Sequence, residues 1–278
     1  MTRTDAAPSL GNLPLWAWPT ALSLDAPLIA GLWQWLFHHS FGVIITWPQI
    51  TALALSVWLI YVADRLLDGL QLDAQKPHSF RHALYARHRR NFALLWLAGL
   101  CLTTALVVTQ LSPVAIRLGL CLGALVAVYG VGVHLLKPFA NFSKELQIGL
   151  VFALGTGLFV WLESPGLQLA LATLLLAGLC SLNCLLIAKW ERKLDKAQQQ
   201  ATMLETPALG DKLELLLLGL AALSSALFPV LPVTLCLAVA AASMGLWGLE
   251  RYAASMSEQA RRVAADAALL TPLLAAVI

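Results

Sequence analysis

The chain has 278 residues, of which 59% are apolar or aromatic and 12% are charged, and its mean hydropathy is +0.77. A soluble domain averages about 45–50% apolar and about 25% charged residues, so these values exclude a soluble globular protein and a disordered chain. The net charge of +3 is too small for a nucleic-acid-binding protein. The composition therefore indicates an all-α, polytopic membrane protein.

Apolar runs long enough to cross a bilayer, about 17–25 residues each, predict nine transmembrane helices around a central cavity. We expect them to form one transmembrane domain over residues 1–278. The first apolar run has no basic stretch before it and no small-residue cleavage site, so we interpret it as a spanning helix and not as a signal peptide. The approximate spans are 20–37, 43–67, 91–111, 113–136, 145–162, 167–190, 213–228, 231–249 and 262–278.

The basic residues predict the orientation of these spans. Every Lys and Arg except Arg3 and Arg117 falls in a connection that follows an even-numbered span. Because Lys and Arg collect on the cytoplasmic side, we expect those connections and the N-terminus to be cytoplasmic and the C-terminus to lie outside. The expected location is the cell's inner membrane, crossed several times.

Two of the cytoplasmic connections, 68–90 and 191–212, are long, basic and polar, whereas the external connections are short. Within the first, residues 79–90 predict a short helix at the membrane surface. This asymmetry indicates that the working face of the protein is cytoplasmic. The five cysteines lie in apolar runs without metal-ligand spacing, so we interpret them as small hydrophobic residues.

Two pairs of carboxylates stand at the cytoplasmic ends of the second and sixth spans. Asp64 and Asp68 form one pair and Glu191 and Asp195 the other, and in each the spacing of four places both side chains on one helix face. Asp64 precedes Glu191 by the same 127 residues that separate Asp68 from Asp195, so the second half of the chain repeats the feature. Charged groups at this depth usually mark function. A helix cap at the membrane interface is the simpler interpretation of a single pair.

Four converging carboxylates repel one another unless a cation lies between them, and Mg²⁺ binds through one or two carboxylates together with substrate phosphates. We therefore predict that Mg²⁺ is the cofactor and that Asp64, Asp68, Glu191 and Asp195 are its ligands. Phosphate charge would meet nearby basic groups. A cavity lined by Trp58, Tyr61 and Trp190 would hold an apolar tail, which together with the headgroup describes an isoprenoid diphosphate. The expected basic groups are Arg65, Lys144, Lys189, Arg192 and Lys193.

The nine-helix plan, with Asp64-x-x-x-Asp68 on the second span and Glu191-x-x-x-Asp195 on the sixth, resembles the UbiA superfamily of intramembrane prenyltransferases. The resemblance implies that the two acidic motifs are catalytic and hold Mg²⁺ and the diphosphate of a prenyl donor. It implies transfer of the prenyl group to an aromatic or other lipophilic acceptor. The chain departs from the family pattern at Ile60 and Tyr61, where the first motif usually has polar residues, and at Glu191, where Asp is usual.

The expected substrate-binding residues are spread over the two motifs and the fifth span. The expected partners of the protein are the isoprenoid diphosphate and the lipid bilayer, and no nucleic acid is expected. The sequence carries no signal for the oligomeric state. These substrate-binding residues are Tyr61, Arg65, Lys144, Asn183, Lys189 and Arg192.

Two other functions remain open. A membrane terpene cyclase would ionise the same substrate without an acceptor, and the apolar Ile60 favours it. A non-catalytic transporter or binding protein would use the carboxylates for ions. Asp266 has Arg262 one turn earlier, which predicts a pair within one helix, whereas Asp25 has no local partner and reaches the ninth span or lines the cavity.

Overall fold

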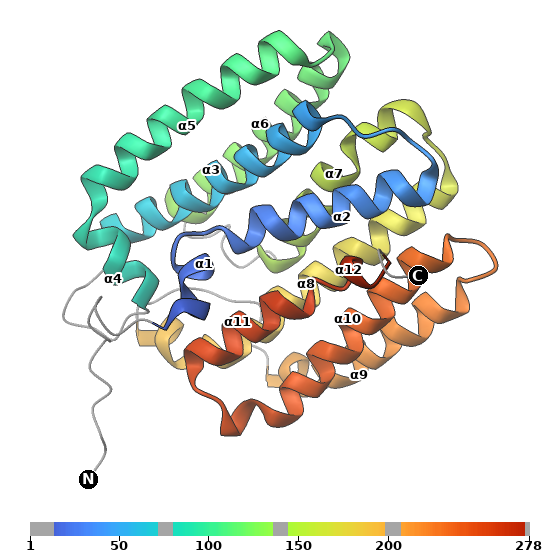
Figure 1. The fold of residues 1–278 in the computed structure, drawn as a ribbon. Helices are drawn as coiled ribbons and strands as arrows, with labels where there is room; N and C mark the ends of the chain where they lie inside the picture. The colour runs from blue at the N-terminus through green and yellow to red at the C-terminus, as the bar shows by residue number, and fades with distance from the viewer. Residues whose placement is uncertain (1–13, 72–79, 136–143, 198–206, 276–278) are drawn as a thin grey trace.

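A computed structural model describes residues 14–71, 80–135, 144–197 and 207–275, and every regular element in these ranges is a helix (Figure 1). Two short 3₁₀ turns, Leu15–Ala17 and Ala253–Ser255, accompany the α-helices. The α-helices are α1 (Trp18–Ala21), α2 (Asp25–Phe41), α3 (Trp47–Gln71), α4 (Phe80–Arg87), α5 (Arg89–Gln110), α6 (Pro113–Leu135), α7 (Lys144–Glu163), α8 (Leu167–Ala197), α9 (Pro207–Ala226), α10 (Val233–Tyr252), α11 (Glu258–Ala268) and α12 (Pro272–Ala275).

Within the described ranges, five helices are long and apolar enough to cross a membrane, which indicates a multi-pass membrane protein. They coincide with the second, third, fifth, sixth and eighth predicted spans, so the all-α class and a long apolar helix at each of these positions are confirmed. The orientation and the central cavity stay predictions. The five segments are Trp47–Leu70, Arg89–Gln110, Lys144–Glu163, Leu167–Arg192 and Val233–Ser255.

The ninth predicted span, 262–278, is not one continuous helix. It is interrupted between α11 and α12 at Leu269–Thr271. The Trp33 indole N–H donates to the Leu269 carbonyl at 2.9 Å, and the Thr271 hydroxyl donates to the Ala238 carbonyl at 2.8 Å. Hydrogen bonds from neighbouring helices make such a break tolerable in apolar surroundings.

Burial divides the helices into an inner and an outer set. Of the most apolar stretch of the candidate span on α8, 72% is buried inside the protein. This helix packs against α7, α9, α10 and α11. The span on α5 is only 6% buried and packs mainly against α3 at the edge of the bundle (Figure 1). Such an apolar but exposed helix fits contact with lipid, so α5 forms part of the outer wall and α8 the centre.

The tightest crossing in the core joins α7 to α8 at Gly149. A Cβ atom at Gly149 would lie 2.6 Å from the Ala177 carbonyl oxygen and would also overlap the Ser181 hydroxyl oxygen. A side chain of any size is therefore excluded here, and small residues at such crossings let two helix backbones approach closely. This contact fixes the position of the start of α7, and with it Lys144 and Glu145, beside α8.

Candidate functional site

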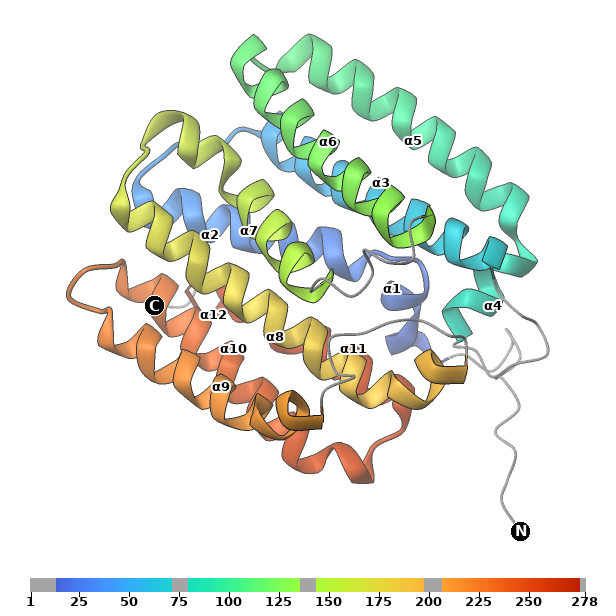
Figure 2. The same ribbon diagram turned by 180° about the vertical axis from the view of Figure 1, so that it is seen from behind.

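The helix ends that carry the charged residues lie at the same end of the bundle. The C-terminal ends of α3 and α8 lie there with the N-terminal ends of α7 and α11, near the start of α2 (Figure 2). Both acidic pairs stand on uninterrupted helices, because α3 continues to Gln71 and α8 to Ala197. The expected placement of the two pairs at the ends of two long helices is thus confirmed.

The described side chains of the acidic pairs differ in their surroundings. Asp64 is exposed and Asp68 is half-buried on α3. The side chains of Lys193 and Asp195 lie outside the described residues, so their predicted roles stay predictions. Glu191, the remaining member, is mostly buried and forms an ion pair.

Glu191 is paired with an arginine from the ninth predicted span. One terminal nitrogen of Arg262, Nη1, donates to both Glu191 carboxylate oxygens, at 2.9 and 3.0 Å. The two side chains are only 22% and 16% exposed. The pair joins α8 to α11 across 71 residues of sequence.

The Arg262 guanidinium also interacts electrostatically with Asp266 and Asp25. Asp266 lies one turn away on α11, as the sequence predicts, but the described hydrogen bonds of Arg262 go to Glu191. Asp25 comes from α2, so of its two predicted placements the structure favours the neighbourhood of the ninth span. Asp25, Glu191, Arg262 and Asp266 are called the interior charge cluster below.

Tyr61 faces the same cluster from α3. Tyr61 lies near Asp266, Asp25 and Cys184. Cys184 on α8 in turn lies near Lys144, Arg262 and Asp266. Of the predicted site residues, Tyr61, Lys144 and Glu191 are therefore brought to one region.

Two side chains beside this region are buried with unpartnered oxygens. Glu145, the second residue of α7, is 2% exposed, and neither of its carboxylate oxygens has a hydrogen-bond partner. It interacts electrostatically with Cys184. Asn183, predicted to bind substrate, is 5% exposed, and its Oδ1 atom also has no hydrogen-bond partner. Both groups offer acceptors that the described protein atoms leave unused.

Arg65, predicted to bind phosphate, is buried in a contact with the start of the chain. Its Nε donates to the Ser23 hydroxyl at 2.6 Å, and its guanidinium lies 5.9 Å from the centre of the Tyr85 ring. Ser23 and Tyr85 also share a hydrogen bond of 3.1 Å. Tyr85 belongs to α4, which occupies most of the predicted surface helix 79–90, so Arg65 holds this surface helix against α3.

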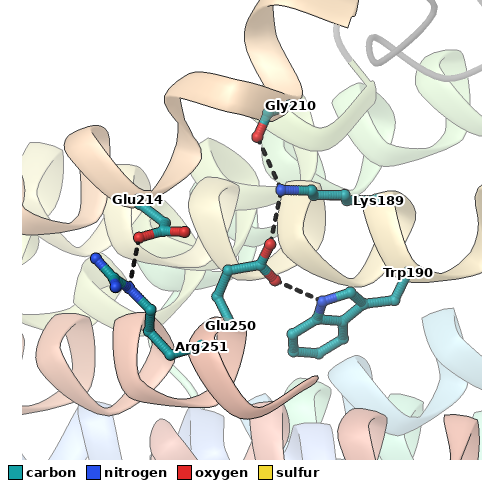
Figure 3. A network of polar contacts seen from close by, with 6 residues as sticks. All are labelled: Lys189, Trp190, Gly210, Glu214, Glu250 and Arg251. Carbon is teal, nitrogen blue, oxygen red and sulfur yellow. Dashed lines mark hydrogen bonds and ion pairs between the residues drawn. The ribbon is translucent and has the colours of Figure 1, made fainter. Parts of the chain in front are cut away.

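Lys189, also predicted to bind substrate, belongs to a network among α8, α9 and α10 (Figure 3). Its ammonium group donates to Glu250 at 2.6 Å and to the Gly210 carbonyl at 3.0 Å. The other Glu250 oxygen accepts from the Trp190 indole at 2.6 Å. Glu214 and Arg251 add an ion pair at 2.8 Å on the outer side of this network.

The remaining predicted residues contribute less to the cluster. Arg192 is half-buried. Trp58, expected to line the cavity, donates to the Leu22 carbonyl at 3.3 Å and packs against Gly99 of α5. One face of Trp190 lies 5.9 Å from the Arg261 guanidinium. Of the three aromatic residues expected at the apolar tail, Tyr61 is the one that faces the interior charge cluster.

The described residues fit the predicted magnesium centre only in part. Among them, no three His, Cys, Asp or Glu side chains lie close enough together to hold a metal ion, and the Glu191 carboxylate is bound to Arg262. Asp64 and Asp68 stand one turn apart on α3, with Asp64 exposed and Asp68 half-buried, and Mg²⁺ needs only one or two carboxylates when phosphates complete its shell.

Sequence reasoning assigned no role to Glu250 and paired Arg262 with Asp266 alone, whereas Glu250 binds Lys189 and Trp190, and Arg262 binds Glu191. A usable signal exists: each is a charged residue in or beside an apolar helix, where charge usually faces the protein interior. Their partners lie on other helices, however, and spacing along the chain does not identify such partners.

Comparison with known proteins adds no assignment. No family model matches the chain, and no curated protein and no solved structure matches it.

Proposed function

We propose that this protein is an intramembrane, Mg²⁺-dependent enzyme of the prenyltransferase type, which ionises an isoprenoid diphosphate and transfers the prenyl group to a lipophilic acceptor. The observation that carries this proposal is the position of the Asp64/Asp68 pair at the end of a membrane-length helix, with Tyr61 one turn further into the bundle near Asp25 and Asp266. A charged headgroup and an apolar tail would each find matching surroundings there.

Asp64 and Asp68 would hold the metal ion, with Asp195 as a further candidate ligand from α8. When bound, Mg²⁺ neutralises the diphosphate and makes it a better leaving group. Lys144 and Arg192 supply positive charge for the phosphates. Arg65 has a structural role in the site, because it holds α4 against α3 close to Asp64.

Tyr61 is the residue we assign to the allylic cation, because an aromatic ring attracts positive charge over its face. The apolar bundle excludes water, which keeps the cation from being hydrolysed before the acceptor reaches it. Asn183 offers a buried, unpartnered oxygen that can accept a hydrogen bond from an acceptor hydroxyl.

The test is release of diphosphate from an allylic diphosphate by the purified protein in lipid nanodiscs. We expect Mg²⁺-dependent release that EDTA abolishes, and a loss of at least about 100-fold in Asp64→Ala and Asp68→Ala, the range seen when one charge-stabilising group is removed. Glu214→Gln is the control, since this carboxylate lies in the outer ion pair with Arg251. Unchanged release in Asp64→Ala and Asp68→Ala would defeat the proposal.

A second candidate, a transporter or ion-binding protein, is favoured by one observation. The ninth predicted span is broken between α11 and α12, and α11 carries buried charge, which resembles the interrupted helices of transporter sites. Under this function the protein releases no diphosphate, whereas sealed vesicles that contain it take up an ion, and this uptake falls in Asp266→Asn.

A further inference from the structure

Three exposed arginines stand close together where α4 meets α5. Arg87 is the last residue of α4, and Arg89 and Arg90 are the first two of α5. Among the described residues none of the three forms an ion pair, and the sequence has no Asp or Glu from residue 74 to residue 144. These three arginines, called the basic corner below, therefore form a patch of positive charge that no acid on α4, α5 or α6 compensates.

The backbone of the basic corner is held by the rest of the protein. The His88 amide donates to the Leu84 carbonyl at 3.0 Å, and the Phe92 amide donates to the His88 carbonyl at 3.1 Å, so the chain passes from α4 to α5 through one residue. The rings of Tyr85 and Phe92 stack with their centres 4.0 Å apart. A corner fixed in this way loses little freedom when it binds a ligand, which favours binding.

Two of these charges are unfavourable for the helix that carries them. The N-terminal end of a helix has partial positive charge, so acidic residues stabilise it and basic residues do not. The first turn of α5 has no acidic residue, Arg89 and Arg90 occupy its first two positions, and the His88 side chain makes no capping hydrogen bond. A local preference that is broken without compensation inside the protein is typical of a functional position.

The surface beside the basic corner is apolar and open to lipid. The candidate span on α5 is the least buried of the five, and it runs along the edge of the bundle (Figure 1). Leu94 and Leu95, about one turn beyond Arg90, are exposed. Positive charge at the end of a lipid-facing helix, with apolar surface along it, matches a phospholipid that has a negatively charged headgroup.

We propose that the basic corner binds the headgroup of an anionic phospholipid whose acyl chains lie along the exposed face of α5. Guanidinium groups bind phosphate through paired, charge-assisted hydrogen bonds, and basic residues beside a transmembrane helix attract anionic lipids. Arg117, exposed near the start of α6, is the only Lys or Arg of that helix, so we assign no such site to it. The binding is independent of the proposed activity, because no metal ion or prenyl diphosphate takes part in it.

The experiment titrates the full chain, purified in detergent micelles, with phosphatidylglycerol, and native mass spectrometry resolves the protein with no lipid and with one lipid bound. We expect Arg89→Gln/Arg90→Gln to weaken binding of the first phosphatidylglycerol at least about fivefold, the effect of one basic residue at an anionic surface. Phosphatidylcholine, whose headgroup has no net charge, should bind equally to the variant and to the unaltered protein. Because basic residues are unfavourable at this helix end, the lipid-free variant should melt at no lower temperature than the unaltered protein, so weaker binding does not reflect unfolding.

The matched control is Arg117→Gln/Lys212→Gln, which also removes two exposed basic residues but leaves the basic corner intact. This control should bind phosphatidylglycerol as tightly as the unaltered protein. Equal loss in the two double variants would show that net charge alone attracts the lipid. Unchanged binding in Arg89→Gln/Arg90→Gln would place the lipid elsewhere, and either result overturns the inference.

Discussion

Glu145 is a buried acid whose two oxygens have no hydrogen-bond partner among the described residues. Burying a charged group without donors is costly, so the folded protein carries this carboxylate at the expense of stability. We expect Glu145→Gln to raise the free energy of unfolding by about 1–3 kcal/mol, the range for an unsatisfied buried polar group. Equilibrium unfolding in mixed micelles with increasing denaturing detergent measures the change.

Glu163→Gln is the matched control for this prediction. It makes the same substitution on the same helix, but Glu163 is exposed at the opposite end of α7. Surface substitutions usually change stability by less than about 0.5 kcal/mol. A fall in stability in Glu145→Gln would show that the carboxylate has a partner the folded protein needs.

Ser23 is a buried residue in the left-handed region, with φ of 58°. Alanine at this position would lose the hydroxyl that accepts from Arg65 and would keep the backbone strain, whereas glycine would lose the hydroxyl and relieve the strain. We expect Ser23→Ala to be less stable than Ser23→Gly by about 1 kcal/mol. The comparison uses the same unfolding measurement, and equal stability of the two variants would contradict the strain.

At the scale of the helices, the crossing of α7 and α8 depends on one hydrogen atom at Gly149. A methyl group there overlaps the Ser181 hydroxyl and the Ala177 carbonyl oxygen, so the helices must separate. We expect Gly149→Ala to lower the free energy of unfolding by about 1–3 kcal/mol, as other overpacked cores do. Detergent-induced unfolding again gives the value.

Gly219→Ala on α9 is the control, because a Cβ atom at this exposed position meets nothing within 4 Å. Alanine is the better helix former, so this variant should gain about 0.5–1 kcal/mol. The free energy of unfolding should therefore rise in Gly219→Ala and fall in Gly149→Ala. A gain in Gly149→Ala would mean that the two helices can move apart without loss.

Sequence reasoning locates helices better than it locates their interruptions. The runs that became α3, α5, α7, α8 and α10 were predictable because length and apolar composition alone define a spanning helix. The break at residues 269–271 was missed, although Pro272 directly follows it and a proline disfavours continuation of the helix that precedes it. At the break, the Leu269 carbonyl accepts a hydrogen bond from Trp33, and the Thr271 hydroxyl donates one to the Ala238 carbonyl. These partners lie on other helices, which only the tertiary structure brings near.

The candidate site shows the same limit. Sequence spacing predicted the two acidic pairs, since residues four apart share a helix face. It also paired Arg262 with Asp266, which does lie near the guanidinium, but it missed the hydrogen bonds from Arg262 to Glu191 on another helix. Lys189 likewise pairs with Glu250, 61 residues away. Contacts between helices decide which charges are free for a ligand.

For the molecule as a whole, the exposure of α5 predicts which surface meets lipid. Cys101 lies exposed near the middle of α5. We expect a nitroxide label on Cys101, with the other cysteines replaced by alanine, to collide with oxygen, which dissolves in the bilayer, and to be protected from water-soluble nickel chelates. Collision rates from power-saturation spectra in nanodiscs measure both.

Arg90→Cys, at the charged end of the same helix, is the control and should show the reverse preference. If the Cys101 label instead met the nickel chelate as readily as the Arg90→Cys label, α5 would lie in water. That result would contradict a transmembrane assignment for the least buried of the five candidate spans.

The uninterrupted length of α8 has a mechanical consequence. Its 31 residues extend for about 46 Å, whereas the hydrocarbon layer is about 30 Å thick. The surplus of about 16 Å means that α8 either tilts in the bilayer or extends past the lipid tails. Because α8 packs against α7, α9, α10 and α11, a change in its tilt shifts all four of these neighbours.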